Sequence, residues 1–317
     1  MAQVASPGGG RAGLSIEGVA FGMALVVFAG TLWSLQGLLV RLMDSSNPWP
    51  ILLVRGVVLA VATVLILFIL GNGRAWPLVR GAGWRGLAAG LALGASGSFF
   101  VVALSYTTIA NAVFILGAGP FFAAFLSRWI LGESVRRQTW IAMGFSLLGV
   151  FLMVFDGLEG GGIMGSMLVL FSSLTFAIYS VILKTVPGVD MNPAALHKGW
   201  TEAAIAASVL LVASWWPDQS AAASPVAMSA KDILLSLGMG LLLASGMLVF
   251  TIGARRLSPA EMTLGSLTEL VLSPVWVWIF VHEVPDALTL VGGAIIIGAI
   301  IYQAASGARR PRPPVVV

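Results

Sequence analysis

Long apolar runs, separated by short polar connections, divide almost the whole chain into segments of about 20 residues. As an α-helix, a segment of this length spans the ~30 Å hydrocarbon core of a bilayer. The pattern predicts ten such helices, near residues 17–41, 50–70, 84–105, 109–130, 137–155, 162–184, 194–216, 232–254, 259–281 and 287–305. It therefore indicates an all-α integral membrane protein.

The first helix and the start of the second reappear later in the chain. Residues 22–56 align without a gap with residues 165–199, and the matched pairs include Gly22 with Gly165, Arg41 with Lys184, Pro50 with Pro193, Arg55 with Lys198 and Gly56 with Gly199. Because each unit holds five helices, an odd number, the second copy enters the membrane in the opposite orientation. The sequence therefore predicts two inverted five-helix repeats, residues 16–157 and 158–305. We expect a disordered N-terminal tail (1–15) and a basic C-terminal tail (306–317).

Composition agrees with a lipid environment and excludes several functions. The chain is 58% hydrophobic and 9% charged, against about 25% charged residues in soluble domains. Its pI is 10.0, but the basic residues are scattered, so no nucleic-acid partner is expected. The chain has no cysteine, and His197 and His282 lie far apart, so we expect no metal site and no cofactor. The sequence holds no phosphate-binding Gly-x-x-x-x-Gly-Lys-Ser/Thr loop for an ATP-driven pump.

The positions of the charges predict the orientation of the helices. Lys and Arg accumulate in the cytoplasmic loops of membrane proteins. With both termini cytoplasmic, most of the 17 basic residues fall inside, namely Arg11, Arg74, Arg80, Arg85, Arg128, Arg136, Arg137, Lys184, Lys198, Arg255, Arg256, Arg309, Arg310 and Arg312. The pattern therefore predicts a multi-pass membrane protein with both ends in the cytoplasm.

Glu269 lies in the middle of the ninth predicted helix. An acid at that depth costs about 2.5 to 3.5 kcal/mol on insertion scales. Ser266 and Ser273 lie on the same face of this helix, and together the three form a polar stripe. The stripe indicates either a cation, amine or proton site that faces the bundle interior, or an acid hydrogen-bonded to a neighbouring helix. Glu261, by contrast, completes a Ser-Pro-x-Glu capping box that begins at Ser258.

Two aromatic and polar pairs occupy matching positions in the repeats. Trp33 and Gln36 are one turn apart on the first helix, and the repeat places Phe176 and Tyr179 at the corresponding positions of the sixth. If these faces point inward, they line a central cavity. Ordinary helix packing explains the same pattern, and the sequence leaves both interpretations open.

Two basic residues also match between the repeats. Arg55 and Lys198 lie inside the second and seventh helices, one and a half turns from the ends. Long basic side chains near helix ends often reach the interface as anchors. The other interpretation is an anion-binding or gating role. His197 and Glu202, on the seventh helix, have the same two interpretations.

Small residues and helix breakers mark further positions. Ala95-Ser96-Gly97 and Ala244-Ser245-Gly246 recur in the third and eighth helices, where small residues permit close packing and Ser245 is also a candidate substrate contact. The fourth helix contains Gly117-Ala118-Gly119-Pro120 and the ninth contains Pro274. Such positions indicate either ordinary kinks or breaks that free backbone groups beside a cavity.

The order and spacing of these residues resemble the drug/metabolite transporter superfamily, in particular its EamA-type branch of ten-helix bacterial inner-membrane proteins. The resemblance covers about residues 17–305. It rests on Leu32-Trp33-Ser34, Arg41, Pro50, Arg55, the stretch from Ala103 through Asn111 and Pro120 to Gly132-Glu133, and in the second half Ser258-Pro259-Ala260-Glu261, Glu269, Ser273-Pro274 and Glu283. Many members carry Glu-Pro in the fourth and ninth helices. This chain departs from that pattern with Gly119-Pro120 and Glu269-Leu270, so the glutamate is present in one half only.

The resemblance implies export or exchange of a small metabolite, such as an amino acid or related compound, by alternating access without ATP. We expect no enzymatic activity. The candidate substrate-binding residues are Trp33, Gln36, Asn111, Tyr179, Ser245, Ser266 and Glu269, with Glu269 also the candidate coupling residue and Arg55 and Lys198 the candidate gates or anchors. Partners are the lipid bilayer and the substrate, with protons and a homodimer left open. The alternatives are a membrane sensor or assembly partner that transports nothing, and an intramembrane enzyme.

Overall fold

The computed structural model describes residues 16–44, 47–103, 106–107, 109–155, 162–186, 188–215, 228–282 and 284–308. Helices account for nearly all of this part of the chain. They are α1 (Ile16–Arg41), α2 (Pro48–Leu70), α3 (Ala75–Ala103), α4 (Ile109–Leu116), α5 (Gly119–Leu131), α6 (Arg137–Val154), α7 (Ile163–Thr185), α8 (Pro193–Trp215), α9 (Ala230–Ala254), α10 (Pro259–Ser266), α11 (Thr268–Val281) and α12 (Ala287–Ala308). The predicted tails at 1–15 and 309–317 lie outside the described residues, and α12 continues through 306–308.

Two of the ten predicted helices are broken in the middle. The fourth consists of α4 and α5, which meet at Gly117 and Ala118, and the ninth consists of α10 and α11, which meet at Leu267. The two breaks occupy matching positions of the repeats, 150 residues apart. The first break coincides with the predicted glycine-rich stretch. Pro274 lies inside α11, so the second break is not located at the proline.

Nine helical segments of the described chain are long and apolar enough to cross a membrane. The tenth span is α8, which has the length but carries His197, Lys198 and Glu202. The structure departs from the sequence prediction at α3, which begins at Ala75 rather than near residue 84. Gly83 has a positive φ of 54°, a conformation that costs glycine little, and it kinks the helix at the predicted start of the span.

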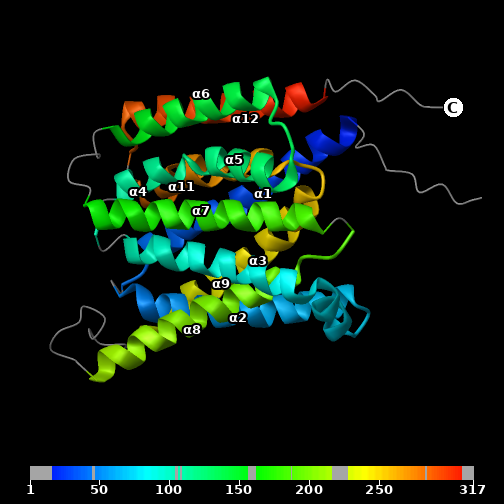
Figure 1. Ribbon diagram of the computed structural model, residues 1–317. Coiled ribbons are helices and arrows are strands. Elements are labelled where there is room, and N and C mark those ends of the chain that lie inside the picture. The colour runs from blue at the N-terminus through cyan, green and yellow to red at the C-terminus, as the bar shows by residue number, and fades with distance from the viewer. Residues whose placement is uncertain are drawn as a thin grey trace, which may run out of the picture.

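The helices pack in pairs that correspond between the two halves. Between the halves, α1 corresponds to α7, α2 to α8 and α3 to α9. The contact of α1 with α9 therefore matches that of α7 with α3, and the contact of α2 with α9 matches that of α8 with α3. The pairs α2 with α8 and α6 with α12 each join equivalent helices of the two repeats. In Figure 1, α6 and α12 lie at one edge of the bundle and α2 and α8 at the other, with α1 and α7 between them. This arrangement confirms the ten-helix, two-repeat fold.

Glycines permit the close contact of equivalent helices. A Cβ on Gly56 of α2 would lie 2.8 Å from the carbonyl oxygen of Gly199 of α8, and a Cβ on Gly199 would lie 2.6 Å from that of Gly56. At the other edge, a Cβ on Gly149 of α6 would lie 2.6 Å from the carbonyl oxygen of Gly292 of α12. Gly56 and Gly199 are 143 positions apart, the offset at which residues 22–56 align with residues 165–199.

Replacing Gly56 with alanine is therefore expected to lower the free energy of unfolding by about 1 to 3 kcal/mol, the usual cost of overpacking. The two nearest neighbours of the new methyl group, the carbonyl oxygen of Gly199 and the amide nitrogen of Ala203, are backbone atoms, which cannot rotate away. Denaturation in detergent, followed by circular dichroism, measures the effect. Gly144→Ala on α6 is the control, because no atom lies within 4 Å of a Cβ there. Equal stability of the two variants would show that the crossing of α2 and α8 tolerates a wider separation.

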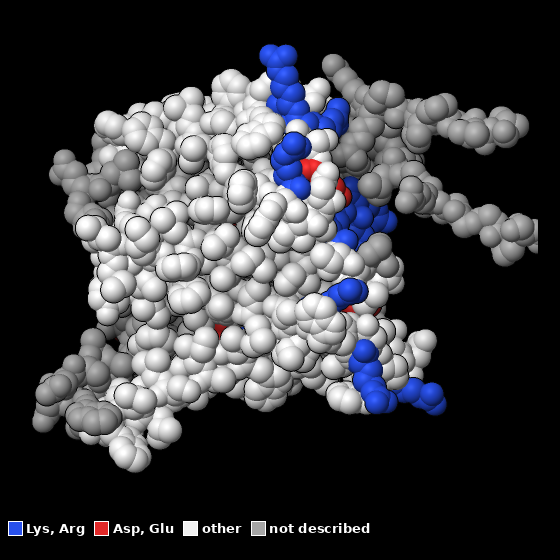
Figure 2. All heavy atoms as spheres, in the orientation of Figure 1, with Lys and Arg blue, Asp and Glu red and all other residues white. Residues whose placement is uncertain are grey.

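Basic residues gather at the end of the bundle where α1 begins and α12 ends, called the basic end below. On the face in Figure 2, lysine and arginine are concentrated there and the opposite end shows none. The helix termini at the basic end carry Arg128 in the last turn of α5, Lys184 in the last turn of α7 and Arg255 after α9. An exposed ion pair at the other end joins Lys231 Nζ to Asp44 at 2.8 Å.

Candidate functional site

A cluster of charged side chains lies inside the bundle, where α2 and α8 cross. The Glu202 carboxylate accepts a hydrogen bond from Arg55 Nη2 at 3.1 Å and forms a second ion pair with Lys198 Nζ, one turn away on α8. Arg55 Nη1 also donates to Gln36 Oε1 of α1 at 3.4 Å. Arg55 and Lys198 are equivalent positions of the two repeats, so each half contributes one cation to the same carboxylate.

The cluster is enclosed by protein. The side chains of Glu202 and Lys198 are 0% and 7% exposed, and that of Arg55 is 14% exposed. Gly97 of α3 lies directly against the Glu202 carboxylate and leaves room for it. In this conformation Arg55 and Lys198 point toward the bundle interior rather than toward the membrane interface. Whether they act as gates stays a prediction.

Glu269 lies in the first turn of α11, two residues after the break at Leu267. The adjoining backbone packs against α1, because a Cβ on Gly30 would lie 3.4 Å from Glu269 N. Glu269 is partly exposed, and the positive charges of Arg55 and Lys198 act on its carboxylate. Its position at a helix N-terminus also favours the negative charge. Ser266 donates to the carbonyl of Thr263, so its hydroxyl is used within its own helix.

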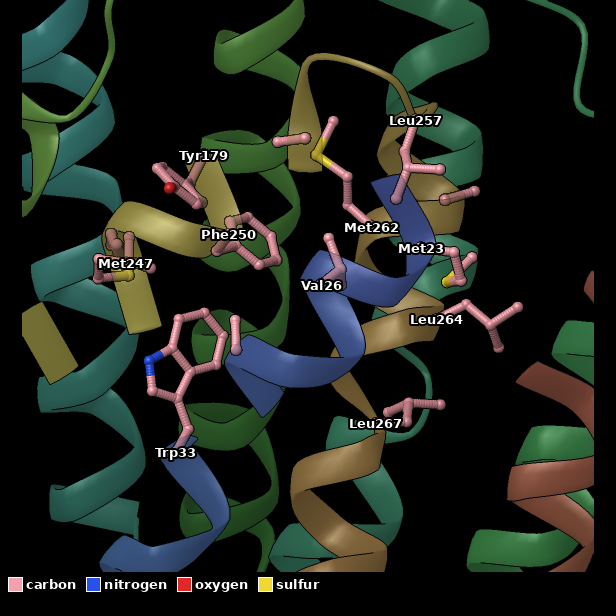
Figure 3. Packing of buried hydrophobic residues seen from close by; sticks show 14 of the residues in the cluster. Met23, Val26, Trp33, Tyr179, Met247, Phe250, Leu257, Met262, Leu264 and Leu267 are labelled. Carbon is pink, nitrogen blue, oxygen red and sulfur yellow. The ribbon is translucent and has the colours of Figure 1, made fainter. Parts of the chain in front are cut away.

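Aromatic rings form a layer next to the charged cluster. Trp33 of α1 lies 5.3 Å from Phe250 of α9, and Tyr179 of α7 lies 6.1 Å from the same ring, measured between ring centroids. Phe176 is 6.2 Å from Phe250. Figure 3 shows Phe250 between Trp33 and Tyr179 where α1, α7 and α9 meet. Trp33 also lies against Gly246, which leaves space for the indole ring.

Several buried polar atoms of this region have no hydrogen-bond partner. Among them are the indole nitrogen of Trp33, the amide nitrogen of Gln36 and Nε of Arg55. All three are donors. A buried donor without a partner costs about 1 to 3 kcal/mol, and such a group in a native structure calls for an explanation. Of these three residues, Arg55 is the one whose charge also acts on the carboxylate of Glu269.

A cavity of about 130 Å³ opens near the basic end, beyond the aromatic layer. It is lined by the end of α7 with Lys184, the following loop with Gly188 and Met191, and the end of α9 with Thr251 and Arg255. Thr251 directly follows Phe250, and Leu183 of the cavity lies one turn after Tyr179. The aromatic layer therefore adjoins this cavity on α7 and α9.

Two predicted site residues lie elsewhere. Ser245 is exposed on the outside of α9 and donates to the Leu241 carbonyl, so the structure does not bring it into the site. The neighbouring Gly246 faces Trp33 instead, because one step along a helix turns the side chain by about 100°. Asn111 of α4 donates to Thr107 at 2.7 Å and Ser166 at 2.9 Å, which ties α4 to α7. Glu261 forms the predicted capping box with Ser258 and accepts a hydrogen bond from Gln303.

Two residues of this region, Glu202 and Phe250, are not among the candidate site residues that the sequence predicts. The signal for Glu202 was present, because opposite charges at positions i and i+4 of a helix lie on one face. That this pair also meets Arg55 of the other repeat depends on the crossing of α2 and α8. Phe250 sits in an ordinary apolar run, and its place among the aromatic rings follows only from how α9 packs on α1.

Two inverted five-helix repeats, a broken helix in each and a buried charged cluster between the repeats are typical of inverted-repeat membrane transporters. The model of the EamA-like transporter family matches residues 20–155 and 163–303. The chain therefore belongs to the EamA-like transporter family, whose members are transporters and not enzymes.

Similar proteins support this assignment. The chain is 26% identical over 299 residues to the pseudopaline exporter CntI of Pseudomonas aeruginosa (strain UCBPP-PA14), covering 88% of this chain and 94% of that protein. It is 27% identical over 180 residues to the inner membrane transporter YedA of Escherichia coli (strain K12), over 56% of this chain and 57% of YedA. One crystal structure superposes with a TM-score of 0.73 at 18% identity, over 90% of this chain and 98% of the other. At that identity the likeness shows the fold alone.

Proposed function

We propose that the chain is a secondary transporter that exports or exchanges a small zwitterionic metabolite, such as an amino acid, across the bacterial inner membrane by alternating access. The observation that carries this proposal is the set of buried donors without a partner on Trp33, Gln36 and Arg55, together with the carboxylate of Glu269, on which the charge of Arg55 acts. The donors suit a substrate carboxylate, because charge-assisted hydrogen bonds are the strong ones. The Glu269 carboxylate suits the substrate amine.

The broken helices and the aromatic layer support alternating access. Discontinuous helices at the repeat interface commonly form the substrate site of such transporters, and Glu269 follows one of the two breaks. In this proposal, the rings of Trp33, Phe250 and Tyr179, which pack together next to the cavity at the basic end, form the closed gate of this conformation. Movement of one repeat against the other would part these rings, because Trp33 belongs to the first repeat and the other two belong to the second.

The proposal includes an orientation and a coupling residue. The basic end is assigned to the cytoplasm by the positive-inside rule, which makes the cavity near Lys184 the cytoplasmic approach. Glu269 binds either the substrate amine or a proton. Since the two compete for one carboxylate, binding of substrate releases a proton and transport becomes proton-coupled.

Counterflow in proteoliposomes tests the transport function. Vesicles that hold the purified protein and an unlabelled mixture of amino acids are placed in labelled amino acids, and accumulation of label above that of protein-free vesicles is expected. A sensor or assembly partner with this fold would move nothing. Absence of counterflow with zwitterionic, cationic and anionic metabolites alike would contradict the proposal, provided the protein remains folded in the vesicles.

Replacing Trp33 with phenylalanine removes the indole N–H and keeps a ring against Phe250. If that donor binds the substrate carboxylate, the loss is about 1.5 to 3 kcal/mol, or roughly tenfold to hundredfold in apparent affinity. Concentration dependence of counterflow measures this. Trp129→Phe is the matched control, because Trp129 is 79% exposed on α5. An unchanged affinity in the Trp33 variant would leave its indole nitrogen without a role in binding.

A further inference from the structure

An apolar groove runs along the edge of the bundle between α6 and α12. Its volume is about 410 Å³, and it is lined by Ile141, Phe145, Ile295, Gly298, Ala299 and Tyr302. It begins next to the tight Gly149–Gly292 contact. From there it continues toward the basic end, where α6 begins and α12 ends. No atom lies within 4 Å of a Cβ placed on Gly298, so the groove is open space along that helix. None of its residues belongs to the charged cluster or the aromatic layer.

Two arginines, Arg136 and Arg137, lie at the end of the groove nearest the basic end. Arg137 is exposed and lies one turn before Ile141, on the same face of α6. Arg136 Nη1 donates to the carbonyl oxygen of Ser306, one turn beyond Tyr302 on α12, at 3.3 Å. An arginine has five N–H donors, so this single hydrogen bond leaves others available. The groove is thus apolar along its length and cationic at the end that meets the membrane surface.

We propose that this groove binds an anionic phospholipid of the leaflet at the basic end, with an acyl chain along the groove and the phosphate at Arg136 and Arg137. The groove faces the bilayer, so an acyl chain that enters it leaves one apolar environment for another and gains little by the hydrophobic effect. Selectivity therefore comes from the headgroup. Basic sites between transmembrane helices at this level bind anionic headgroups by their charge, and a zwitterionic lipid lacks the net charge that two arginines attract.

Native mass spectrometry of the intact protein, released from nanodiscs with equal amounts of phosphatidylglycerol and phosphatidylethanolamine, tests the proposal. The wild-type protein is expected to retain phosphatidylglycerol preferentially. The double variant Arg136→Gln, Arg137→Gln should lose roughly tenfold in the ratio of the two lipids. Gly298→Leu should reduce retention of both lipids by filling the groove. Gly144→Leu, on α6 outside the groove and likewise without a neighbouring atom within 4 Å, is the control and should behave as the wild-type protein.

Two results would overturn the proposal. One is an unchanged lipid ratio in the double arginine variant whose circular dichroism and unfolding midpoint match those of the wild-type protein. The other is a dimer that Gly298→Leu dissociates and Gly144→Leu does not, because the groove would then hold a second copy of the chain. Both measurements are independent of transport, so they stand apart from any test of the substrate.

Discussion

Replacing Glu202 with glutamine is expected to lower the free energy of unfolding by about 3 to 5 kcal/mol, the usual cost of removing one partner from a buried ion pair. The wild-type carboxylate serves both Arg55 and Lys198. Glutamine keeps the shape but leaves the two cations enclosed near each other without the charge that balances them. Chemical denaturation of the protein in detergent, followed by circular dichroism, measures the change.

A second variant separates charge imbalance from lost packing. The double variant Lys198→Gln, Glu202→Gln removes one charge of each sign and leaves Arg55 with Glu269. It should be more stable than Glu202→Gln alone, because the like charges no longer face each other. Side chains in one network show coupling energies of about 0.5 to 3 kcal/mol. If the two substitutions are instead additive, or if Glu202→Gln unfolds at the wild-type midpoint, the cluster does not hold the two repeats together.

Replacing Glu269 with glutamine is expected to abolish the pH dependence of transport and to weaken substrate binding by roughly tenfold to hundredfold. In the proposed mechanism the ionised carboxylate binds the substrate amine, and protonation abolishes that interaction. Affinity of the wild-type protein should therefore fall as the pH is lowered. The glutamine variant carries no titrating group at this position, so its affinity should stay low and constant across the same range. Counterflow at several pH values measures both quantities.

The pH profile distinguishes a coupling role from a structural one. The groups that act on Glu269 are Arg55 of α2 and Lys198 of α8, and both remain in the variant. Glu133→Gln is the control, since Glu133 is exposed after α5 and interacts only with Ser127 among the described residues. A Glu269→Gln protein whose transport retains the wild-type pH dependence would remove Glu269 from the coupling mechanism. Loss of rate with an unchanged pH profile would assign it a structural role.

The amino-acid sequence predicts more of the helical scaffold than of the candidate site. Gly56 and Gly199 were aligned by the repeat, and the structure places them in contact with each other. The glycine-rich stretch at Gly117 indicated the first helix break, but the matching break at Leu267 has no proline or glycine at its centre. Among the site residues, Gln36 and Arg55 are joined by a hydrogen bond, whereas Ser245 lies on the outer face of α9.

The amino-acid sequence by itself determined the ten spans, the duplication and the concentration of basic residues at one end. Each of these follows from a local requirement, since every helix in lipid must be apolar along its own length whatever its neighbours are. Only the tertiary structure decided which polar groups meet. Arg55, Glu202 and Lys198 come together because the Gly56–Gly199 contact fixes how α2 and α8 cross and rotate. That packing depends on two surfaces far apart in the chain, and no local pattern encodes it.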